Sequence, residues 1–326
     1  DKSVAVIGSG PAGLTAAHIL NQRGFHVTVF EKSEEPGGLL MFGIPNMKLP
    51  KERLRQRVEI LKQEGITFVC NTDVGKDMPV SELDKFDAVV LCGGAGQPRD
   101  LSVSGRNLPG VRYAVPFLAD ATRRVLRGET EDKPLEGRKV VVIGGGDTGN
   151  DCVATSIRMG ASSVVQLEIM PPAPETRALD NPWPRWPTVL KTDYGQQEAI
   201  WLFGRDPRTF EITAVSIIGD EKNGVTGIET AQVEWVTTER GRMPKQIESS
   251  VKRQAATDVL IAMGFVGAET YLPGAMNVTI DKSVYATSRP GVFAAGDMRT
   301  GQSLVVRASA DAVRAAAEVE QYLLSK

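Results

Sequence analysis

The strongest pattern of hydrophobic and polar positions in this chain is a short apolar run that ends in glycines and continues into a helical repeat. It occurs twice. The first copy predicts a strand over residues 4–7, a helix over 11–22 and a strand over 26–31. The second predicts a strand over 139–143, a helix over about 148–159 and a strand within 162–170. Each copy is therefore expected to form a βαβ unit of a parallel sheet.

Both copies carry the turn spacing Gly-x-Gly-x-x-Gly. The glycines are Gly8, Gly10 and Gly13 in the first copy, and Gly144, Gly146 and Gly149 in the second. Such a turn opens a helix whose free N–H groups and positive dipole end can bind a pyrophosphate. The sequence therefore predicts two dinucleotide-binding turns in one chain.

An acidic residue supports the assignment of the first turn. The second strand of that copy ends at Glu31, 23 residues after Gly8. This is the expected distance for a carboxylate that accepts hydrogen bonds from an adenosine ribose. The corresponding position in the second copy falls near Leu167 or Glu168.

The rest of the pattern completes an α/β arrangement. A helix is expected over 51–65, where Leu54, Val58 and Leu61 lie at helical spacing. Short alternating segments over 209–236 favour a small antiparallel sheet. Further strands are expected at 66–70, 87–92, 257–265 and 291–297, and a final amphipathic helix at 303–324.

The order of these elements predicts two Rossmann-like dinucleotide-binding domains, one inserted in the other. We expect residues 1–112 and 256–326 to form the outer domain and residues 113–255 the inserted one. The alternative is two consecutive independent domains. It leaves the strand that ends on Asp297 and the final helix without a sheet to join.

Composition excludes several classes of function. The 326 residues hold 38 Lys and Arg against 40 Asp and Glu, a net charge of −2, so no electrostatic footprint for nucleic acid or an anionic membrane is present. No run approaches the roughly 18 apolar residues of a membrane span, and no signal-peptide pattern opens the chain, so we expect a cytoplasmic protein.

Cysteine and histidine usage narrows the chemistry further. Cys70, Cys92 and Cys152 show no C-x-x-C spacing, which argues against an iron–sulfur cluster, a zinc site or a redox-active dithiol within these residues. No metal site is predicted. The only histidines, His18 and His26, are expected to be structural.

Longer motifs carry a resemblance to a known family. The two glycine-rich turns, Glu31 and the terminal GVFAAGD resemble the two-dinucleotide flavin reductases, whose fold is glutathione/thioredoxin reductase-like. The segments PGGLLMFGIPNMKLP, QLEIMP, NPWPRWP and GVFAAGDMRTGQSLVV are similar to those of the glutamate synthase small (β) subunit and its relatives, including the flavin-and-NADPH part of dihydropyrimidine dehydrogenase. The resemblance covers essentially the whole chain.

The resemblance implies that the outer domain binds FAD and the inserted one NAD(P)H, with a hydride passing between them. Positioning supplies most of the catalysis of such a transfer, so no catalytic side chain is expected. For FAD the resemblance implies the pyrophosphate turn, Glu31 at the ribose, Val74 at the adenine, and flavin or ribityl contacts. In full these residues are Gly8, Gly10, Ala12, Gly13, Glu31, Gly38, Leu39, Val74, Gly296, Asp297, Gln302, Ser303 and Leu304. A helix-capping role is the alternative for Asp297.

For NAD(P)H the resemblance implies Gly144, Gly146, Asp147 and Thr148 at the pyrophosphate. Asp147 is awkward beside a phosphate, and capping the helix is its alternative role. A 2′-phosphate calls for arginine, and Arg158 or Arg177 could supply it, whereas Glu168 would suit a free 2′-hydroxyl. The resemblance favours NADPH, and NADH stays open.

Two loop segments keep more than one interpretation. Residues 171–187 hold six prolines and two tryptophans, which exclude a helix or a central strand. They could form a lid over the nicotinamide, a partner-docking loop or a rigid structural loop. The segment around Lys48 could line the flavin.

Three functions follow as hypotheses. The first is an NADPH-oxidising flavoprotein that passes electrons to a partner resembling the glutamate synthase large subunit. The second is a self-contained disulfide or ferredoxin-type reductase; its disulfide form requires a C-x-x-C that the sequence lacks. The third is a non-catalytic redox-sensing module. Family members carry a cysteine-rich N-terminal iron–sulfur region that this sequence lacks. Glutamate formation itself is not predicted, because an amidotransferase usually needs an N-terminal cysteine and the sequence begins with Asp1.

Overall fold

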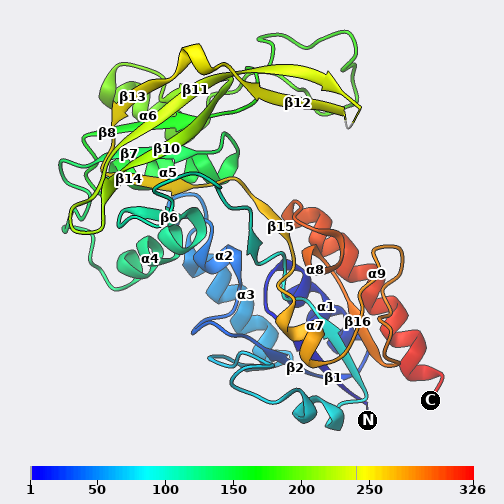
Figure 1. Ribbon diagram of the computed structural model, residues 1–326. Helices are drawn as coiled ribbons and strands as arrows, with labels where there is room; N and C mark the ends of the chain where they lie inside the picture. The colour runs from blue at the N-terminus through cyan, green and yellow to red at the C-terminus, as the bar shows by residue number, and fades with distance from the viewer. Residues whose placement is uncertain (1, 240) are drawn as a thin grey trace. The chain divides into compact units, whose positions relative to one another are not determined.

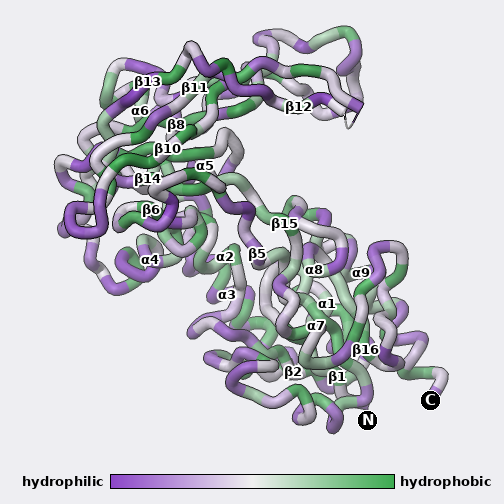
Figure 2. The backbone as a smooth tube through the Cα atoms, in the orientation of Figure 1, coloured by the Kyte–Doolittle hydropathy of each residue, from purple (hydrophilic) through white to green (hydrophobic). Residues whose placement is uncertain are grey.

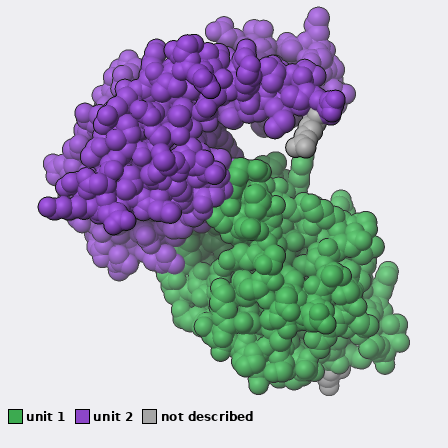
Figure 3. Space-filling view, in the orientation of Figure 1, with its two compact units in different colours: residues 1–99, 264–326 green, residues 100–263 purple. Residues whose placement is uncertain are grey.

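The computed structural model describes residues 2–239 and 241–326 and divides into two compact units. The first combines residues 1–99 with 264–326, and the second is residues 100–263 (Figure 3). The first unit is therefore built from two separate stretches of chain.

The first unit is centred on a five-stranded parallel sheet in the order β16-β4-β1-β2-β3. Its strands are β1 (Ser3–Ile7), β2 (His26–Phe30), β3 (Thr67–Val69), β4 (Ala88–Leu91) and β16 (Val292–Ala294). A separate antiparallel pair is formed by β5 (Gln97–Pro98) and β15 (Phe265–Gly267), which are close in sequence to the two points where the chain passes from one unit to the other.

Two long helices of the first unit, α1 (Pro11–Gln22) and α9 (Val305–Leu324), pack against each other (Figure 1). The buried face of α9 carries Ala312, Ala315 and Ala316, whose small side chains allow this close approach. The remaining helical elements are α2 (Leu39–Phe42), α3 (Lys51–Gln63), η1 (Val80–Lys85), α7 (Tyr271–Ala275) and α8 (Asp297–Thr300).

The second unit repeats the architecture with a sheet in the order β6-β14-β7-β8-β9. Its strands are β6 (Val111–Tyr113), β7 (Lys139–Ile143), β8 (Ser163–Leu167), β9 (Arg208–Thr209) and β14 (Asp258–Ile261), and its helices are α4 (Ala114–Leu126), α5 (Asp147–Arg158) and α6 (Tyr194–Phe203). An antiparallel layer is formed by β10 (Ile212–Asp220), β11 (Gly224–Thr238), β12 (Gly241–Gln246) and β13 (Lys252–Ala255), with η2 (Glu248–Ser250) between the last two.

The parallel sheets form the cores of the two units. Residues of β1, β4, β7 and β14 are almost all buried, as expected for strands covered on both faces. Figure 2 shows hydrophobic stretches of chain inside the units, as near β14, and hydrophilic residues in many of the outer connections. None of the described helices is long and apolar enough to cross a membrane.

The predicted α/β class with two Rossmann-like units is confirmed, and α1 has the predicted bounds. Strand β16 pairs with β4, so the alternative of two consecutive domains does not describe this chain. The predicted boundaries need correction: residues 100–112 and 256–263 belong to the second unit. The reason is that β14 pairs with β6 and β7 and so completes the second sheet.

Candidate dinucleotide sites

The first glycine-rich turn connects β1 to α1 and is closely packed on one side only. Gly8 has φ +97°, and a Cβ there would lie 2.5 Å from the carbonyl oxygen of Cys92. A Cβ on Gly13 would lie 1.9 Å from the carbonyl oxygen of Gly8. A Cβ on Gly10 would have no atom within 4 Å. The outer glycines are required for packing, and the middle one leaves space for a ligand.

The helix that follows this turn offers free hydrogen-bond donors. Gly10 is the N-cap of α1 and makes no side-chain cap, and Pro11 has no N–H. The next backbone N–H groups, of Ala12 and Gly13, have no acceptor within the helix because of helix geometry. Together with the dipole, they form an anion-binding site.

Glu31 follows β2 and lies directly against the turn. Its Oε2 accepts hydrogen bonds from the backbone N–H of Ser9, at 3.1 Å, and from the Ser9 hydroxyl, and its Oε1 accepts from the N–H of Ser33 at 2.8 Å. The Ser9 hydroxyl oxygen also accepts from the N–H of Gly37 at 2.9 Å. Ser9, which the sequence analysis missed, thus fixes the carboxylate and the next loop to the turn.

Two more glycines predicted for this site lie beside the same turn. A Cβ on Gly38 would lie 2.9 Å from the Cα of Gly10, and a Cβ on Gly296 would lie 2.5 Å from the Cβ of Ala12. The N–H of Gly296 donates to the buried carboxylate of Asp311 at 2.8 Å. The fold therefore brings segments far apart in sequence to the amino end of α1.

The other residues predicted for the first unit occupy varied positions. Leu39 begins α2 and is half exposed, whereas the side chain of Val74 is buried in the core. Asp297 accepts a hydrogen bond from the Ser303 hydroxyl at 2.5 Å, and Leu304 is the N-cap of α9. The side-chain oxygen of Gln302 accepts from the N–H of Phe265 at 2.8 Å.

The capping role considered for Asp297 is wrong. Gly296 is the N-cap of α8 and Leu304 that of α9, and neither helix has a side-chain cap. Asp297 instead joins α8 to the start of α9 through Ser303.

The second turn connects β7 to α5 with the same geometry. Gly144 has φ +129° and lies against the carbonyl oxygen of Ala262. A Cβ on Gly149 would lie 2.1 Å from the carbonyl oxygen of Gly144. A Cβ on Gly146 would have no atom within 4 Å. Gly146 is the N-cap of α5.

Asp147 is the first residue of α5 and makes no side-chain cap, so the capping alternative is wrong for this residue too. Thr148 follows it within the first turn of α5. The second turn therefore leaves free N–H groups at the amino end of α5, as the first turn does at α1.

A buried polar network connects the second turn to β8 and α6. The side-chain N–H of Gln166 donates to the carbonyl oxygen of Gly144 at 2.9 Å, and the side-chain oxygen of Gln166 accepts from Gln196 at 3.0 Å. Gln196 belongs to a capping box with Asp193 at the start of α6. The D-x-x-Q spacing could have predicted this helix start, which the sequence analysis missed.

The two arginines proposed for a 2′-phosphate have other partners in the structure. Arg158 is the last residue of the 12-residue helix α5, about 16 Å along the axis from the turn, and it forms an ion pair with Glu198. Arg177 lies in the proline- and tryptophan-rich segment and donates to the carbonyl oxygens of Asn181 and Arg185. The prediction for Arg158 is wrong, because the length of α5 separates this residue from the turn at the other end of the helix.

The cysteine thiols are unsuited to redox exchange. All three are free, and burial raises the pKa of the Cys92 thiol to about 12 and also raises that of Cys152. Burial and the charge of Glu31 raise the pKa of the half-buried Cys70.

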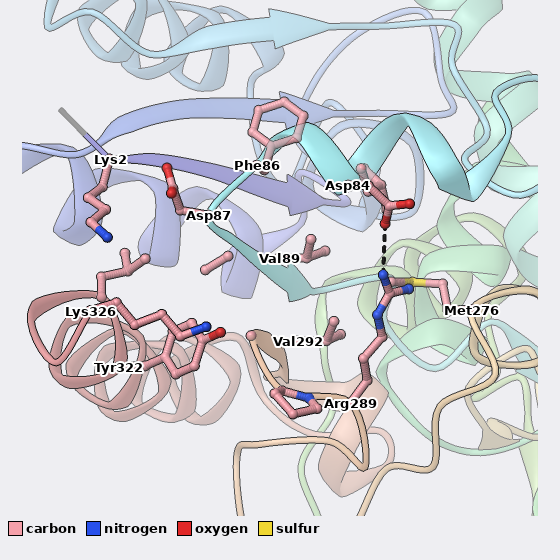
Figure 4. Close-up of a pocket in the computed structure, with 15 residues that line it drawn as sticks. Lys2, Asp84, Phe86, Asp87, Val89, Met276, Arg289, Val292, Tyr322 and Lys326 are labelled. Atoms are coloured by element: carbon pink, nitrogen blue, oxygen red, sulfur yellow. Dashed lines mark hydrogen bonds and ion pairs between the residues drawn. The ribbon is translucent and has the colours of Figure 1, made fainter.

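A separate cavity of about 400 Å³ lies at the amino ends of β1, β4 and β16, the edge of the sheet opposite to the turn (Figure 4). Its lining includes Arg289, which is paired with Asp84, and Tyr322. It is no part of either dinucleotide site.

Comparison with known proteins places the chain among redox enzymes. Residues 2–186 match the family model described as pyridine nucleotide-disulphide oxidoreductase. The chain is 44% identical over 335 residues to the glutamate synthase [NADPH] small chain of Bacillus subtilis, covering 99% of this chain and 68% of that one. It is also 44% identical to the glutamate synthase [NADH] of Schizosaccharomyces pombe, covering 98% of this chain and 16% of that protein.

A solved structure shows the same fold. FprA from Mycobacterium tuberculosis in complex with NADPH superposes with a TM-score of 0.75 at 21% identity, covering 99% of this chain and 85% of the other. The chain thus spans most of the length of FprA but only about a sixth of the fungal relative.

Proposed function

Because this chain belongs to the pyridine nucleotide-disulphide oxidoreductase family, and within it to the glutamate synthase small chains, we propose that it is an FAD-dependent oxidoreductase. It takes a hydride from NADPH onto flavin and passes electrons to a partner. The observation that carries the proposal is the pair of uncapped glycine-rich turns, one in each unit, both with an open middle glycine.

The first turn suits FAD. The open space at Gly10 and the free N–H groups of Ala12 and Gly13 would hold the pyrophosphate, and the carboxylate of Glu31, fixed by Ser9, would hold the adenosine ribose. When bound, FAD supplies the acceptor for the hydride and the carrier for single electrons.

Further contacts to FAD are proposed from the same unit, with Val74 at the adenine and the other residues at the flavin or ribityl part. Gly38 and Gly296 lie against the turn, and Leu39, Val74 and Asp297 are carried over from the family resemblance. Gln302, Ser303 and Leu304 precede α9, whose 20 residues direct a positive dipole end toward this segment. That dipole end favours negative charge, which is what a reduced flavin carries.

The second turn suits the nicotinamide dinucleotide. The space at Gly146 and the free N–H groups of Asp147 and Thr148 would hold its pyrophosphate. The charge of Asp147 opposes this binding in part, and its exposure lets solvent screen it.

We propose a glutamate synthase large-chain-like protein as the electron acceptor, in the cytoplasm. The fungal relative supports this assignment, because there the matching region is 16% of one glutamate synthase polypeptide. A dithiol-based reductase is disfavoured, since Cys92 and Cys152 are buried and the sequence has no C-x-x-C motif.

The test is anaerobic mixing of the flavin-loaded protein with NADPH, and separately with NADH, while the visible absorbance of the oxidised flavin is followed. We expect rapid bleaching. In Gly146→Val the side chain fills the open space at normal φ, so the fold persists while nucleotide affinity falls at least about tenfold through lost charge-assisted hydrogen bonds.

Gly274→Val is the matched control, because a Cβ at Gly274 also meets open space, but Gly274 belongs to α7 of the first unit and to neither glycine-rich turn. Wild-type protein that keeps FAD but shows no bleaching with either nucleotide would refute hydride transfer and favour the binding-module alternative.

A further inference from the structure

A buried ion pair joins α8 to α9, which lie side by side in the first unit (Figure 1). The guanidinium of Arg299 on α8 donates to both carboxylate oxygens of Asp311 on α9, with 3.3 Å between Arg299 Nε and Asp311 Oδ2. Each side chain is only 8% exposed. At a surface such a pair contributes little, but a buried charge that loses its partner is strongly destabilising. The two helices are therefore fixed to each other by charge as well as by packing.

The same carboxylate holds the segment that leads into α8. Asp311 Oδ2 accepts a hydrogen bond from the N–H of Gly296 at 2.8 Å. Gly296 has φ +68°, and a Cβ there would lie 2.5 Å from the Cβ of Ala12 and 3.7 Å from the Cβ of Ala308. Gly296 therefore packs against both α1 and α9, with its N–H directed to Asp311.

The guanidinium of Arg299 has two further contacts in the loop between α7 and β16. Its Nη1 donates to the carbonyl oxygen of Lys282, and its central carbon lies 4.3 Å from the centre of the Tyr285 ring. The hydrogen bond with Asp311 raises the pKa of Arg299 above its ordinary value, so the positive charge persists at every working pH. The loop, α8 and α9 thus meet at one buried cation.

This pair lies one residue away from the first glycine-rich turn. Gly296 is in contact with Ala12, whose N–H is one of the free donors at the amino end of α1. A lone buried carboxylate so close to an anion-binding turn would oppose the anion, because charges interact strongly away from water. Arg299 neutralises that carboxylate, so the N–H of Gly296 gains an ionised acceptor without net negative charge beside the turn.

On the basis of the proposed function, we infer that Arg299 and Asp311 are positioning residues for FAD. Asp311 holds the backbone of Gly296, and with it Asp297, in the place where FAD binds. Arg299 holds Asp311 and cancels its charge beside the pyrophosphate. Both residues act through Gly296. The affinity of the first unit for FAD therefore depends on the pair, whereas the affinity of the second unit for the nicotinamide dinucleotide does not.

The test measures how fast FAD leaves the holoprotein after dilution, from the rise in flavin fluorescence, in wild type and in Asp311→Asn. Asparagine keeps the size and one acceptor oxygen but removes the charge that Arg299 and the N–H of Gly296 bind. We expect FAD to leave about tenfold to a hundredfold faster, the range of a hydrogen bond to a charged group. The visible circular dichroism of the bound flavin should change, while calorimetry with FAD in excess should give an unchanged affinity for NADP⁺.

The double variant Arg299→Met with Asp311→Leu separates positioning from folding, because an apolar pair of similar volume can keep a fold stable. It still lacks an acceptor for the N–H of Gly296, so FAD should leave at least as fast as from Asp311→Asn. Glu320→Gln is the matched control. Glu320 also lies on α9 and pairs with Arg23 at 3.0 Å, but this pair is more exposed and its loss should leave FAD release unchanged.

Release of FAD at the wild-type rate from Asp311→Asn or from the double variant would overturn the inference while the proposed function stands. Equal losses of affinity for FAD and NADP⁺ would overturn it too, because they would show a general loss of structure. If the wild-type protein itself does not retain FAD, the proposed function fails and the inference with it.

Discussion

At the scale of single residues, the two sites depend on which side chains are absent as much as on those present. Gly10 and Gly146 leave open space in front of a helix end, while Gly13 and Gly149 let each helix pack on its own turn. Glu31 is fixed by a serine, and Glu168 is not. Two turns of the same spacing therefore differ in the acceptor that they offer a ligand.

The cysteines give a prediction at this scale. Iodoacetamide should modify Cys70 in the native protein and leave Cys92 and Cys152 unmodified, because both are buried. The raised pKa of Cys70 means that little thiolate exists at neutral pH, so its labelling should accelerate steadily from about pH 7 to about pH 10.

Peptide mass spectrometry of the native and unfolded protein would measure these rates, with the unfolded sample as the control. Labelling of Cys92 in the native protein as fast as Cys70 would contradict the packing described here.

Among the elements, helical spacing of apolar residues accounts for the long helices, whereas the proline- and tryptophan-rich segment has no such spacing. Residues 171–187 contain neither helix nor strand, as predicted, and the segment is held by hydrogen bonds such as those from Arg177 to Asn181 and Arg185. Trp183 and Trp186 remain 83% and 79% exposed. A few residues after this segment, the chain enters the capping box of Asp193 and Gln196 that begins α6.

That capping box supplies the prediction for this scale. Asp193→Ala removes the acceptor for the first N–H groups of α6 and should lower the free energy of unfolding by about 1 kcal/mol. Urea denaturation would measure it, with Glu221→Ala as an exposed control. A loss no larger than that of the control would mean that packing alone holds α6.

In the whole molecule, the second sheet receives its last strand, β14, before the first sheet receives its last strand, β16. The second unit is a continuous stretch, residues 100–263, whereas the first needs both ends of the chain. Strand β14 lies between β6 and β7, so the second sheet is complete only when residues 258–261 are included.

The prediction is that residues 100–263 fold alone and bind the nicotinamide dinucleotide without FAD. The matched fragment 113–255, which has the boundaries expected from the sequence, lacks β14 and most of β6 and should not fold cooperatively. Circular dichroism during thermal unfolding would compare them. Two equally cooperative transitions would show that β14 is dispensable.

The two strand–turn–helix units, their glycines and Glu31 could be predicted from the sequence alone, because each is marked by a pattern within a short stretch of chain. The spacing of the three cysteines also argued against a redox-active dithiol of the C-x-x-C kind. Three features could be learned only from the folded chain. Residues 258–261 join the second sheet, Arg158 pairs with Glu198 at the far end of α5, and Asp297 accepts a hydrogen bond from Ser303 instead of capping a helix. These features depend on pairing between distant segments. Apolar runs such as VVL at 89–91 and VLI at 259–261 are alike in pattern, and only the packing of the whole sheet distinguishes them.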